Sequence, residues 1–341
     1  HPSWDVMMSS HQIHNLERLE EVLGEPAIIE LAINSNAGIW IEKAGAAHMH
    51  RFDGISLTPS DVTDLAGQIA RDAKLTLTEA SPMISATVPY SGAPLRVQAL
   101  IAPAAFGGTI LSFRVFRQRL PTEEPKKFGF LRQQGISLET DRLAKIEQIQ
   151  RIASDLGVGG DADAVLKACV DMKLNMIVSG PTSAGKTELA RRLMWMIPDE
   201  ERLVLIEDSA EALPHQPNHV SLIAERNDAS ARSADKLLQA TLRLRPDRII
   251  LGEVRGGEAA TFLGAINTGH EGSFTTLHAA SGRKAMDKMA LLVMNTGTQL
   301  NYGEILRYLR GSIDAVIQTG REGEARGIME VYFPALDADL I

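Results

Sequence analysis

The segment GPTSAGKT, which runs from Gly180 to Thr187, constrains this chain more than any other part of its sequence. A short apolar run at 175–179 precedes it, and helix-forming residues follow at 188–196. A buried strand, a Gly-rich turn and a helix are the context in which this spacing forms a phosphate-binding loop. The sequence therefore predicts a P-loop that binds a nucleoside triphosphate.

Backbone N–H groups and two side chains of this loop are expected to hold the phosphates. The loop amides and the start of the following helix face the ligand, where the helix dipole favours negative charge. The Lys186 ammonium reaches the β- and γ-phosphates, and the Thr187 hydroxyl ligates Mg²⁺. The predicted ATP-binding residues of the loop are Gly180, Pro181, Thr182, Ser183, Ala184, Gly185, Lys186 and Thr187.

Two later apolar segments end in carboxylates, as expected for ligand-binding edges of a doubly wound sheet. Residues 203–207 end at Glu207, and residues 248–253 end at Glu253 in a Walker B-like pattern with Glu in place of the usual Asp. Such carboxylates orient Mg²⁺ and polarise the attacking water. Arg255 is expected either to pair with Glu253 or to meet a phosphate. The predicted metal ligands are Thr187, Glu207 and Glu253.

A third polar segment, residues 268–279, carries two histidines. Glycines flank His270, and His278 follows a polar strand. A neutral imidazole beside the γ-phosphate senses it through a hydrogen bond and passes the signal to the next helix. A His/His/Glu metal site is the alternative, although nothing else supplies convincing ligands. The predicted catalytic residues are Lys186, Glu207, Glu253, His270 and His278.

The order of apolar and polar segments predicts two domains and an α/β fold. Residues 8–118 are expected to form an N-terminal α+β domain and 119–139 a linker. Residues 140–341 alternate strand and helix signals, which predicts a mostly parallel sheet. In the first domain, Ser60 or Asp61 is expected to cap a helix. Strands are predicted at 30–34, 38–42, 95–100, 109–115, 176–179, 203–207, 248–251, 273–277 and 315–318, and helices at 231–244, 257–267 and 282–294.

Composition limits the class of protein further. A net charge of −8 and a pI near 5.7 argue against a dedicated nucleic-acid binder. The single cysteine, Cys169, excludes an internal disulfide and a tetracysteine zinc site. No run of about 18 apolar residues predicts a transmembrane helix, and no secretory signal is visible. Residues 1–6 precede the first methionine, so the native start is expected at Met7 or Met8.

Together these segments resemble the type II/type IV secretion traffic ATPases. The P-loop, the acidic box at 206–208, the run at 251–258 and the histidine box at 268–279 follow the order and spacing of that family. Residues 217–220 and the Arg-Gly-Gly-Glu run resemble its type IV secretion and conjugation branch in particular.

The resemblance implies more than the motifs alone. It implies a RecA-like motor domain, a homo-hexameric ring, and Arg96 and Arg114 reaching the nucleotide from the N-terminal domain. It also implies a peripheral place at the cytoplasmic face of the inner membrane and partners from a type IV secretion or conjugation apparatus. Two departures bear on the site: Glu188 stands where relatives often have Thr, and Glu271 stands in the histidine box where small residues or proline are common.

Three alternatives share the P-loop. A type II secretion or type IV pilus motor has the same fold, although its assembly ATPases often carry a tetracysteine zinc insert. A RecA-like DNA-translocating ATPase would show salt-dependent DNA binding. A non-hydrolysing nucleotide switch is opposed by the presence of Lys186, Thr187, Glu207 and Glu253.

Overall fold

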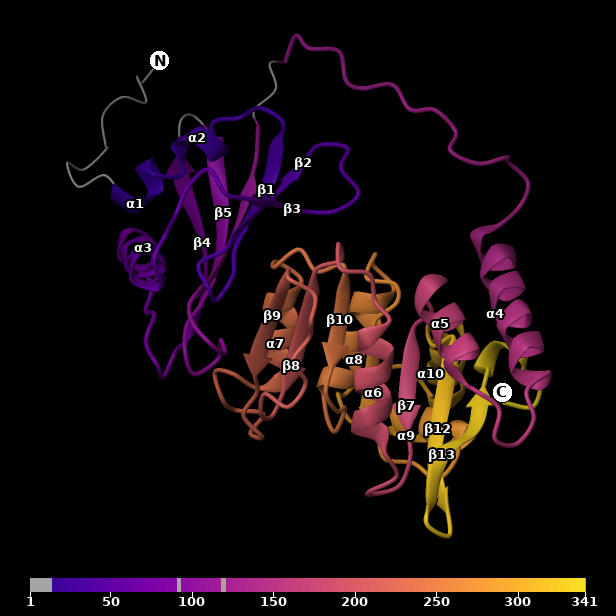
Figure 1. Cartoon of the computed structure of the whole chain (residues 1–341). Coiled ribbons are helices and arrows are strands. Elements are labelled where there is room, and N and C mark those ends of the chain that lie inside the picture. Colours follow the sequence, from indigo (N-terminus) through magenta and orange to yellow (C-terminus); the bar gives the residue numbers. More distant parts are fainter. Residues whose placement is uncertain (1–13, 91–92, 118–120, 341) are drawn as a thin grey trace. The chain divides into compact units, whose positions relative to one another are not determined.

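The computed structural model describes residues 14–90, 93–117 and 121–340, whose helices and strands are shown in Figure 1. They divide into two compact units. Unit 1 holds the described residues up to 117 together with 199–211 and 216–246, and unit 2 holds the others. The expected start at Met7 or Met8 lies outside the described residues.

Unit 1 contains a six-stranded antiparallel sheet in the order β3-β2-β1-β6-β5-β4. Strand β4 alternates buried and exposed residues along most of its length, the pattern of a sheet with one face on a core. Four of these strands match the sequence-based expectation within two residues, whereas β3 and β4 were not expected. The strands are β1 (Ile28–Ile33), β2 (Ile39–Lys43), β3 (His50–Phe52), β4 (Met83–Tyr90), β5 (Ala93–Leu100) and β6 (Ile110–Val115).

Helix α3 (Pro59–Asp72) begins at a capping box. The Thr58 hydroxyl accepts a hydrogen bond from Asp61 N at 3.1 Å, and the Asp61 carboxylate accepts one from Thr58 N at 2.8 Å. Proline at the first helical position favours a start there, because its ring presets φ and its missing N–H leaves no donor unsatisfied. The expectation that Ser60 or Asp61 is the cap was therefore wrong: Thr58 caps the helix and Asp61 completes the box.

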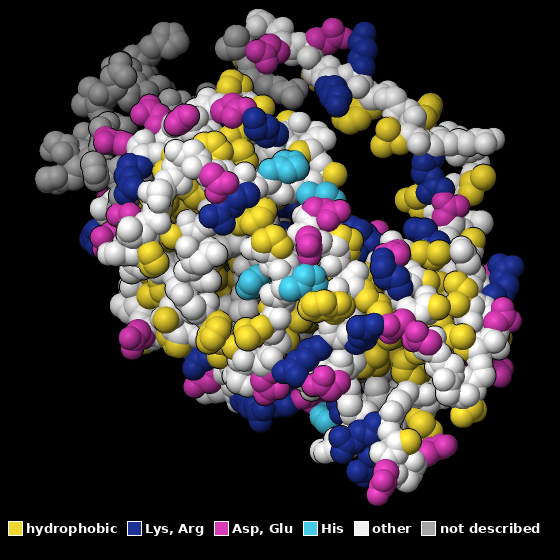
Figure 2. Space-filling view, in the orientation of Figure 1, with side chains coloured by type: hydrophobic (Ala, Val, Ile, Leu, Met, Phe, Trp, Pro, Cys, Tyr) yellow, Lys and Arg dark blue, Asp and Glu magenta, His cyan; other side chains and the backbone are white. Residues whose placement is uncertain are grey.

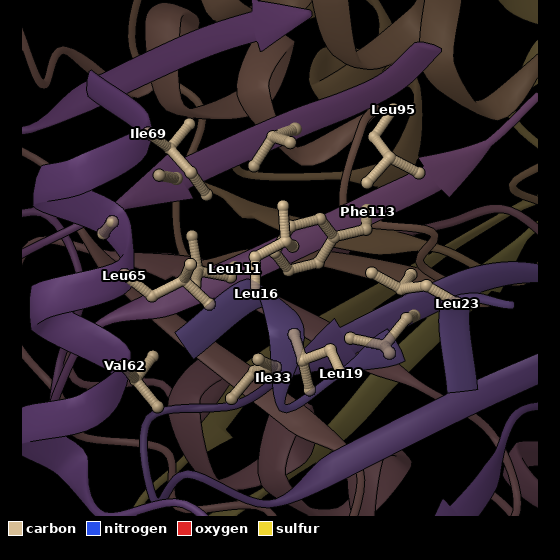
Figure 3. Packing of buried hydrophobic residues seen from close by; sticks show 14 of the residues in the cluster. Leu16, Leu19, Leu23, Ile33, Val62, Leu65, Ile69, Leu95, Leu111 and Phe113 are labelled. Atoms are coloured by element: carbon tan, nitrogen blue, oxygen red, sulfur yellow. The ribbon is translucent and has the colours of Figure 1, made fainter. Parts of the chain in front are cut away.

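The core of the sheet lies on the face covered by α3 and by the short helices α1 (His14–Glu17) and α2 (Glu20–Leu23). Figure 3 shows side chains of α3, such as Leu65, packed with Leu111 and Phe113 of β6. Leu65, Leu111 and Phe113 are fully buried. Burying such a side chain contributes about 1.5–3 kcal/mol, so this face holds the N-terminal sheet and its helices together.

Polar contacts join the N-terminal sheet to the residues of unit 1 that come later in the chain. The fully buried Arg202 donates from Nη1 to Asn34 Oδ1 at 2.7 Å and from Nε to the carbonyl of Leu244 at 2.8 Å. Arg245 makes two hydrogen bonds of 2.8 Å to the carboxylate of Glu42. Unit 1 is therefore built from segments far apart in the sequence.

The second sheet has seven strands in the order β13-β12-β7-β11-β10-β8-β9. The pairs β12–β7, β7–β11, β11–β10 and β8–β9 are parallel, and the β12–β13 hairpin is antiparallel. A mostly parallel sheet was expected from the sequence and is confirmed. Its strands are β7 (Met176–Ser179), β8 (Leu203–Glu207), β9 (His219–Ile223), β10 (Arg248–Leu251), β11 (Phe274–Leu277), β12 (Ala315–Glu322) and β13 (Ala325–Tyr332).

The described residues 121–340 contain seven α-helices longer than one turn. Helix α7 is shorter than the expected 231–244, because the Ser233 hydroxyl accepts a hydrogen bond from Lys236 N and sets its start. Residues 121–137 form neither helix nor strand. The helices are α4 (Leu138–Ser154), α5 (Asp163–Asp171), α6 (Lys186–Trp195), α7 (Ala234–Thr241), α8 (Glu258–Ile266), α9 (Gly282–Met294) and α10 (Tyr302–Ser312).

Two further properties concern the described helices and the surface charges. Across residues 14–90, 93–117 and 121–340, no helix has the length and apolar character needed to cross a bilayer. Figure 2 shows Lys and Arg side chains interspersed with Asp and Glu on the visible face. Mixed charges of this kind agree with the modest acidic net charge of the chain.

Candidate nucleotide-binding site

The predicted P-loop connects β7 to α6 and requires glycine at its first position. A Cβ atom on Gly180 would lie 2.2 Å from Oγ1 of Thr319 on β12. That hydroxyl donates a hydrogen bond to the carbonyl of Ser179 at 3.1 Å, which holds β12 against the start of the loop. Close approach of a neighbouring strand therefore excludes any side chain at position 180.

The loop itself turns through left-handed backbone. Ser183 has φ +60° and Gly185 has φ +90°, conformations that most residues with a Cβ avoid. Gly185 is the N-cap of α6, and no side chain caps the helix there. The first N–H groups of α6 and its dipole are therefore directed at the loop, as in a site for an anion.

Lys186, the first residue of α6, is buried with its ammonium inside the loop. Its Nζ donates to the carbonyls of Gly180 at 3.0 Å and Pro181 at 2.8 Å. It also lies 3.1 Å from Nδ1 of His278. Burial lowers the pKa of Lys186 and the charge of Lys288 lowers it further, while Glu253 opposes both. The ammonium is thus desolvated and held where an anion would approach it.

His278 reaches Lys186 because β11 and β7 run parallel in register. Leu277 pairs with Ser179, so the residues after both strands meet at one edge of the sheet. An ammonium has only N–H donors, so Nδ1 of His278 accepts from Lys186. The other ring nitrogen, Nε2, lies 3.2 Å from Oε1 of Glu253. The imidazole therefore bridges the lysine and the carboxylate.

Glu253 follows β10 and is held from two sides. Its Oε1 faces His278, and its Oε2 accepts a hydrogen bond from the Arg255 guanidinium. Burial raises the pKa of Glu253, but the hydrogen bond and charge of Arg255, together with the charge of Lys186, lower it below its ordinary value. The carboxylate is therefore ionised at neutral pH. Of the two roles left open for Arg255, pairing with Glu253 is the one seen.

A pocket of about 370 Å³ lies beside this group of charges. It is lined by Pro181, Thr182, His278, Ala279 and Ala280. The small side chains of Ala279 and Ala280 leave room next to the loop amides, and the lysine supplies a positive charge. The chemistry of these donors fits the phosphates of a nucleotide.

Thr187 is one of the residues that the sequence predicts to hold Mg²⁺. Thr187 lies exposed in the first turn of α6, beside Lys186. Among the described residues, no group of three or more His, Cys, Asp or Glu side chains is arranged to hold a metal ion. Mg²⁺ in such sites is usually held by one or two protein groups together with the substrate phosphates, not by protein ligands alone. The Thr187 hydroxyl fits this mode of binding.

His270 lies at the other end of β11 from His278. It precedes the strand, and its Nδ1 lies 2.9 Å from the carbonyl of Ala265 near the end of α8. The carbonyl of His270 in turn accepts a hydrogen bond from Ser273 Oγ at 2.6 Å. The structure does not bring His270 to the P-loop. A four-residue strand separates the two histidines, so they occupy opposite edges of the sheet.

The remaining predicted residues belong to unit 1. Glu207 ends β8, and its carbonyl accepts a hydrogen bond from Ala224 N at 2.7 Å. Arg96 and Arg114 face each other across β5 and β6. Arg114 Nε lies 3.2 Å from Oε1 of Glu30, and the Arg96 guanidinium lies 4.7 Å from the ring centre of Phe116.

Three polar residues that sequence reasoning missed support the site. Thr319 closes on the start of the P-loop, Lys288 Nζ donates to the carbonyl of His278 at 2.8 Å, and Glu258 binds the turn after Glu253. For Glu258 a signal existed, because an acidic residue after Gly-Gly marks a helix start. Thr319 and Lys288 act through contacts between distant segments, for which the sequence holds no local signal.

Comparison with known proteins places the chain in a family. The family described as "Type II/IV secretion system protein" matches residues 14–320, and the chain belongs to it. Curated relatives include the type IV secretion system protein VirB11 of Bartonella henselae, which is 31% identical over 331 residues, covering 93% of this chain and 91% of the relative. The VirB11 protein of Brucella suis is 31% identical, covering 94% of this chain and 89% of the relative.

A solved structure agrees with these relatives. The crystal structure of the VirB11 ATPase from the Brucella suis type IV secretion system, in complex with sulphate, has a TM-score of 0.80 and 29% identity, with 94% of each chain covered. The predicted α/β fold, the resemblance to the type IV secretion branch and the assignment as a secretion ATPase are thereby confirmed. The chain is a nucleotide-binding member of this family.

Proposed function

We propose that this chain is the ATP-hydrolysing, homo-hexameric motor of a bacterial type IV secretion or conjugation system. The observation that carries the proposal is the line of polar contacts from Lys186 through His278 to Glu253 at the end of the P-loop. It joins a phosphate-binding cation, an imidazole and an ionised carboxylate in one place. Phosphoryl transfer needs little more than this, since it depends on positioning and charge stabilisation.

The P-loop binds the triphosphate of ATP. The loop from Gly180 to Thr187 supplies backbone N–H groups, and the α6 dipole stabilises the negative charge of the β-phosphate. Lys186 exchanges its carbonyl partners for phosphate oxygens, which form stronger, charge-assisted hydrogen bonds. Arg96 and Arg114 are proposed to contact the nucleotide as well.

Hydrolysis requires a group that orients the attacking water. Glu253 is ionised, so it can accept a hydrogen bond from the attacking water and polarise it. Thr187, Glu207 and Glu253 are the proposed residues around Mg²⁺, which supplies charge neutralisation on the phosphate oxygens when it is bound. His270 does not contact the P-loop of the same chain, because it lies at the other edge of the sheet.

His278 is placed to report on the γ-phosphate. When Lys186 turns to the phosphates, Nδ1 of His278 loses its donor, and the ring can turn toward the new anion. Its carbonyl is bound by Lys288 of α9 at 2.8 Å, and the next carbonyl, of Ala279, is bound by Gln318 Nε2 of β12 at 3.0 Å. Movement of the histidine is therefore passed to a helix and a strand that pack on β7.

The wider setting of the motor is part of the same proposal. Residues 8–118 are proposed as the N-terminal domain, 119–139 as the linker and 140–341 as the RecA-like motor. Membership of the family and the VirB11 relatives support a ring that works with other components of a type IV secretion apparatus, peripherally at the cytoplasmic face of the inner membrane.

Two measurements on the purified chain test the proposal. ATP turnover is followed by phosphate release with and without Mg²⁺, and electron microscopy is performed with and without ATP. We expect Mg²⁺-dependent turnover and a six-fold ring. A chain that binds ATP but never hydrolyses it would sink the motor assignment, and a persistent monomer would sink the hexamer.

A further inference from the structure

The turn between β10 and α8 carries both Glu253 and Arg255, and one buried side chain closes it. Glu258 is the first residue of α8 and is only 6% exposed. Its Oε1 accepts hydrogen bonds from Arg255 N at 2.6 Å and from Gly256 N at 2.9 Å. A single carboxylate oxygen therefore fixes two successive peptide units of this turn.

The same turn is held on its other side by the strand that leads to His278. Oγ1 of Thr276 donates to the carbonyl of Gly252 at 2.6 Å, and Val254 N donates to the carbonyl of Thr276 at 3.1 Å. Glu253 thus lies between two anchored points, one on β11 and one made by Glu258. The backbone on both sides of the carboxylate has little freedom.

We propose that Glu258 is a positioning residue for ATP hydrolysis: by holding the backbone of Arg255 and Gly256, it aims the Arg255 guanidinium at Glu253 and so keeps the Glu253 carboxylate directed at His278. The inference rests on the proposed hydrolysis and adds a residue to it. Glu258 acts through Arg255 and touches no substrate.

The geometry says which property of Glu258 matters. Both backbone hydrogen bonds use Oε1, so an amide oxygen at the same place can accept them as well. The negative charge at the start of α8 interacts with the helix dipole, which is a separate effect. Reach matters too, since an Asp side chain withdraws the oxygen by one carbon–carbon bond.

Three variants separate these properties: Glu258→Gln keeps the acceptor and loses the charge, Glu258→Asp keeps the charge and loses the reach, and Glu258→Ala loses both. We expect Glu258→Gln to retain most of the turnover. In Glu258→Asp and Glu258→Ala, kcat should fall roughly 10- to 100-fold, the range for a misplaced catalytic group. The Kd for ATP should change little, because the P-loop is untouched.

The split between kcat and KM provides a readout that a purely structural role would not produce. In Glu258→Asp the Arg255 guanidinium is no longer aimed at Glu253, so kcat falls while the KM for ATP stays within a few-fold of wild type. Arg255→Gln should show the same split. The double variant Glu258→Asp/Arg255→Gln should lose no more activity than Arg255→Gln alone, because both substitutions interrupt the same series of contacts.

Glu304→Ala is the matched control. Glu304 also lies at a helix start and accepts a backbone N–H, that of Asn301 at 2.8 Å, but on α10 away from the P-loop. It should leave kcat and the KM for ATP as in wild type. Equal turnover in wild type and Glu258→Asp, or fully additive losses with Arg255→Gln, would overturn the inference. A wild-type chain without ATP turnover would instead overturn the proposed function.

Discussion

Nδ1 of His278 lies 3.1 Å from the ammonium of Lys186. The ammonium can only donate, so Nδ1 is the acceptor of this contact, and Nε2 of the same ring faces Oε1 of Glu253 at 3.2 Å. A nucleotide phosphate and the imidazole both compete for the lysine. The contact therefore links binding of the phosphate to the state of the histidine and, through it, of Glu253.

Removal of the lysine tests the phosphate contact directly. Lys186→Ala deletes a charge-assisted hydrogen bond, worth about 1.5–3 kcal/mol, so ATP affinity should fall about 10- to 100-fold. Turnover should be abolished. Isothermal titration with ATP and a phosphate-release assay measure the two effects. Lys284→Ala, an exposed lysine of α9, is the control that should behave as wild type. Wild-type turnover in Lys186→Ala would remove the P-loop from the mechanism.

Replacement of the carboxylate tests hydrolysis apart from binding. Glu253→Gln keeps the size of the side chain, but its neutral amide cannot accept a proton from the attacking water as the carboxylate can. We expect ATP to bind within a few-fold of wild type, and turnover to fall by about 100-fold or more. Asp171→Asn on α5, where the carboxylate pairs with Lys167, is the control. Undiminished turnover in Glu253→Gln would transfer the catalytic role to Glu207.

Much of the site could be predicted because its signals are local. The strand, loop and helix around Lys186 follow each other along the chain, and their patterns predict each element separately. Parallel strands place their carboxyl ends at one edge, so Glu253 and His278 were expected to lie near the loop. The structure shows both beside Lys186.

What could not be predicted depends on direction and on distant contacts. His270 precedes a four-residue strand and His278 follows it, so the two side chains lie at opposite ends of that strand. Their closeness in the sequence wrongly suggested that both lie beside the P-loop. Strand β9 and the hairpin strand β13 were missed. Strand β13 is mostly exposed and lacks the apolar alternation that marks a covered strand. The orientation of Arg255 depends on Glu258, one turn further along, which no periodicity reveals.

Asp337 in the C-terminal segment should make the free energy of unfolding depend on pH in the acidic range. Asp337 accepts hydrogen bonds from Arg283 Nη2 at 2.7 Å and from the Tyr332 hydroxyl at 2.8 Å. The hydrogen bond from Arg283 has the largest effect on the pKa of Asp337 and lowers it; burial, next in size, raises it, and the hydrogen bond from Tyr332 lowers it further. A lowered pKa means that the stabilisation is present above the unfolded value, about 3.9, and is lost as pH falls through the folded value.

Asp337→Asn should therefore destabilise unit 2 at pH 7 and by less near pH 2, because wild type gains the proton as the pH falls through the lowered pKa of Asp337. Urea unfolding at the two pH values measures the difference. Because Arg283 is half exposed, solvent screens the pair and the loss at pH 7 should be small. Tyr332→Phe removes a hydrogen bond that also lowers the pKa of Asp337, so its effect should likewise be smaller at low pH. An Asp337→Asn loss that is equal at both pH values would contradict an origin in ionisation.

Glu30 should have the opposite dependence on pH. It lies on β1, is 7% exposed, and has a pKa raised to about 7. Burial is the main cause and the neighbouring charge of Glu42 adds to it, while the charges of Arg114, Arg245 and Arg202 lower the value. The folded state holds a proton that the unfolded chain releases between pH 4.5 and 7. The free energy of unfolding therefore falls as pH rises through this window.

Glu30→Gln removes the ionisation and should stabilise β1 above pH 7, by at most about 3 kcal/mol for a pKa difference of this size. The pair with Arg114 offsets little of this gain, because that guanidinium is mostly exposed. Hydrogen exchange of the β1 amides at pH 5 and pH 8 reports on the local opening. Glu42→Gln should act in the other direction, since it weakens two hydrogen bonds to the largely buried Arg245. If Glu30→Gln opened β1 more readily at pH 8 than wild type, the carboxyl would be a stabilising anion, and its burial would have to be offset by the arginines around it.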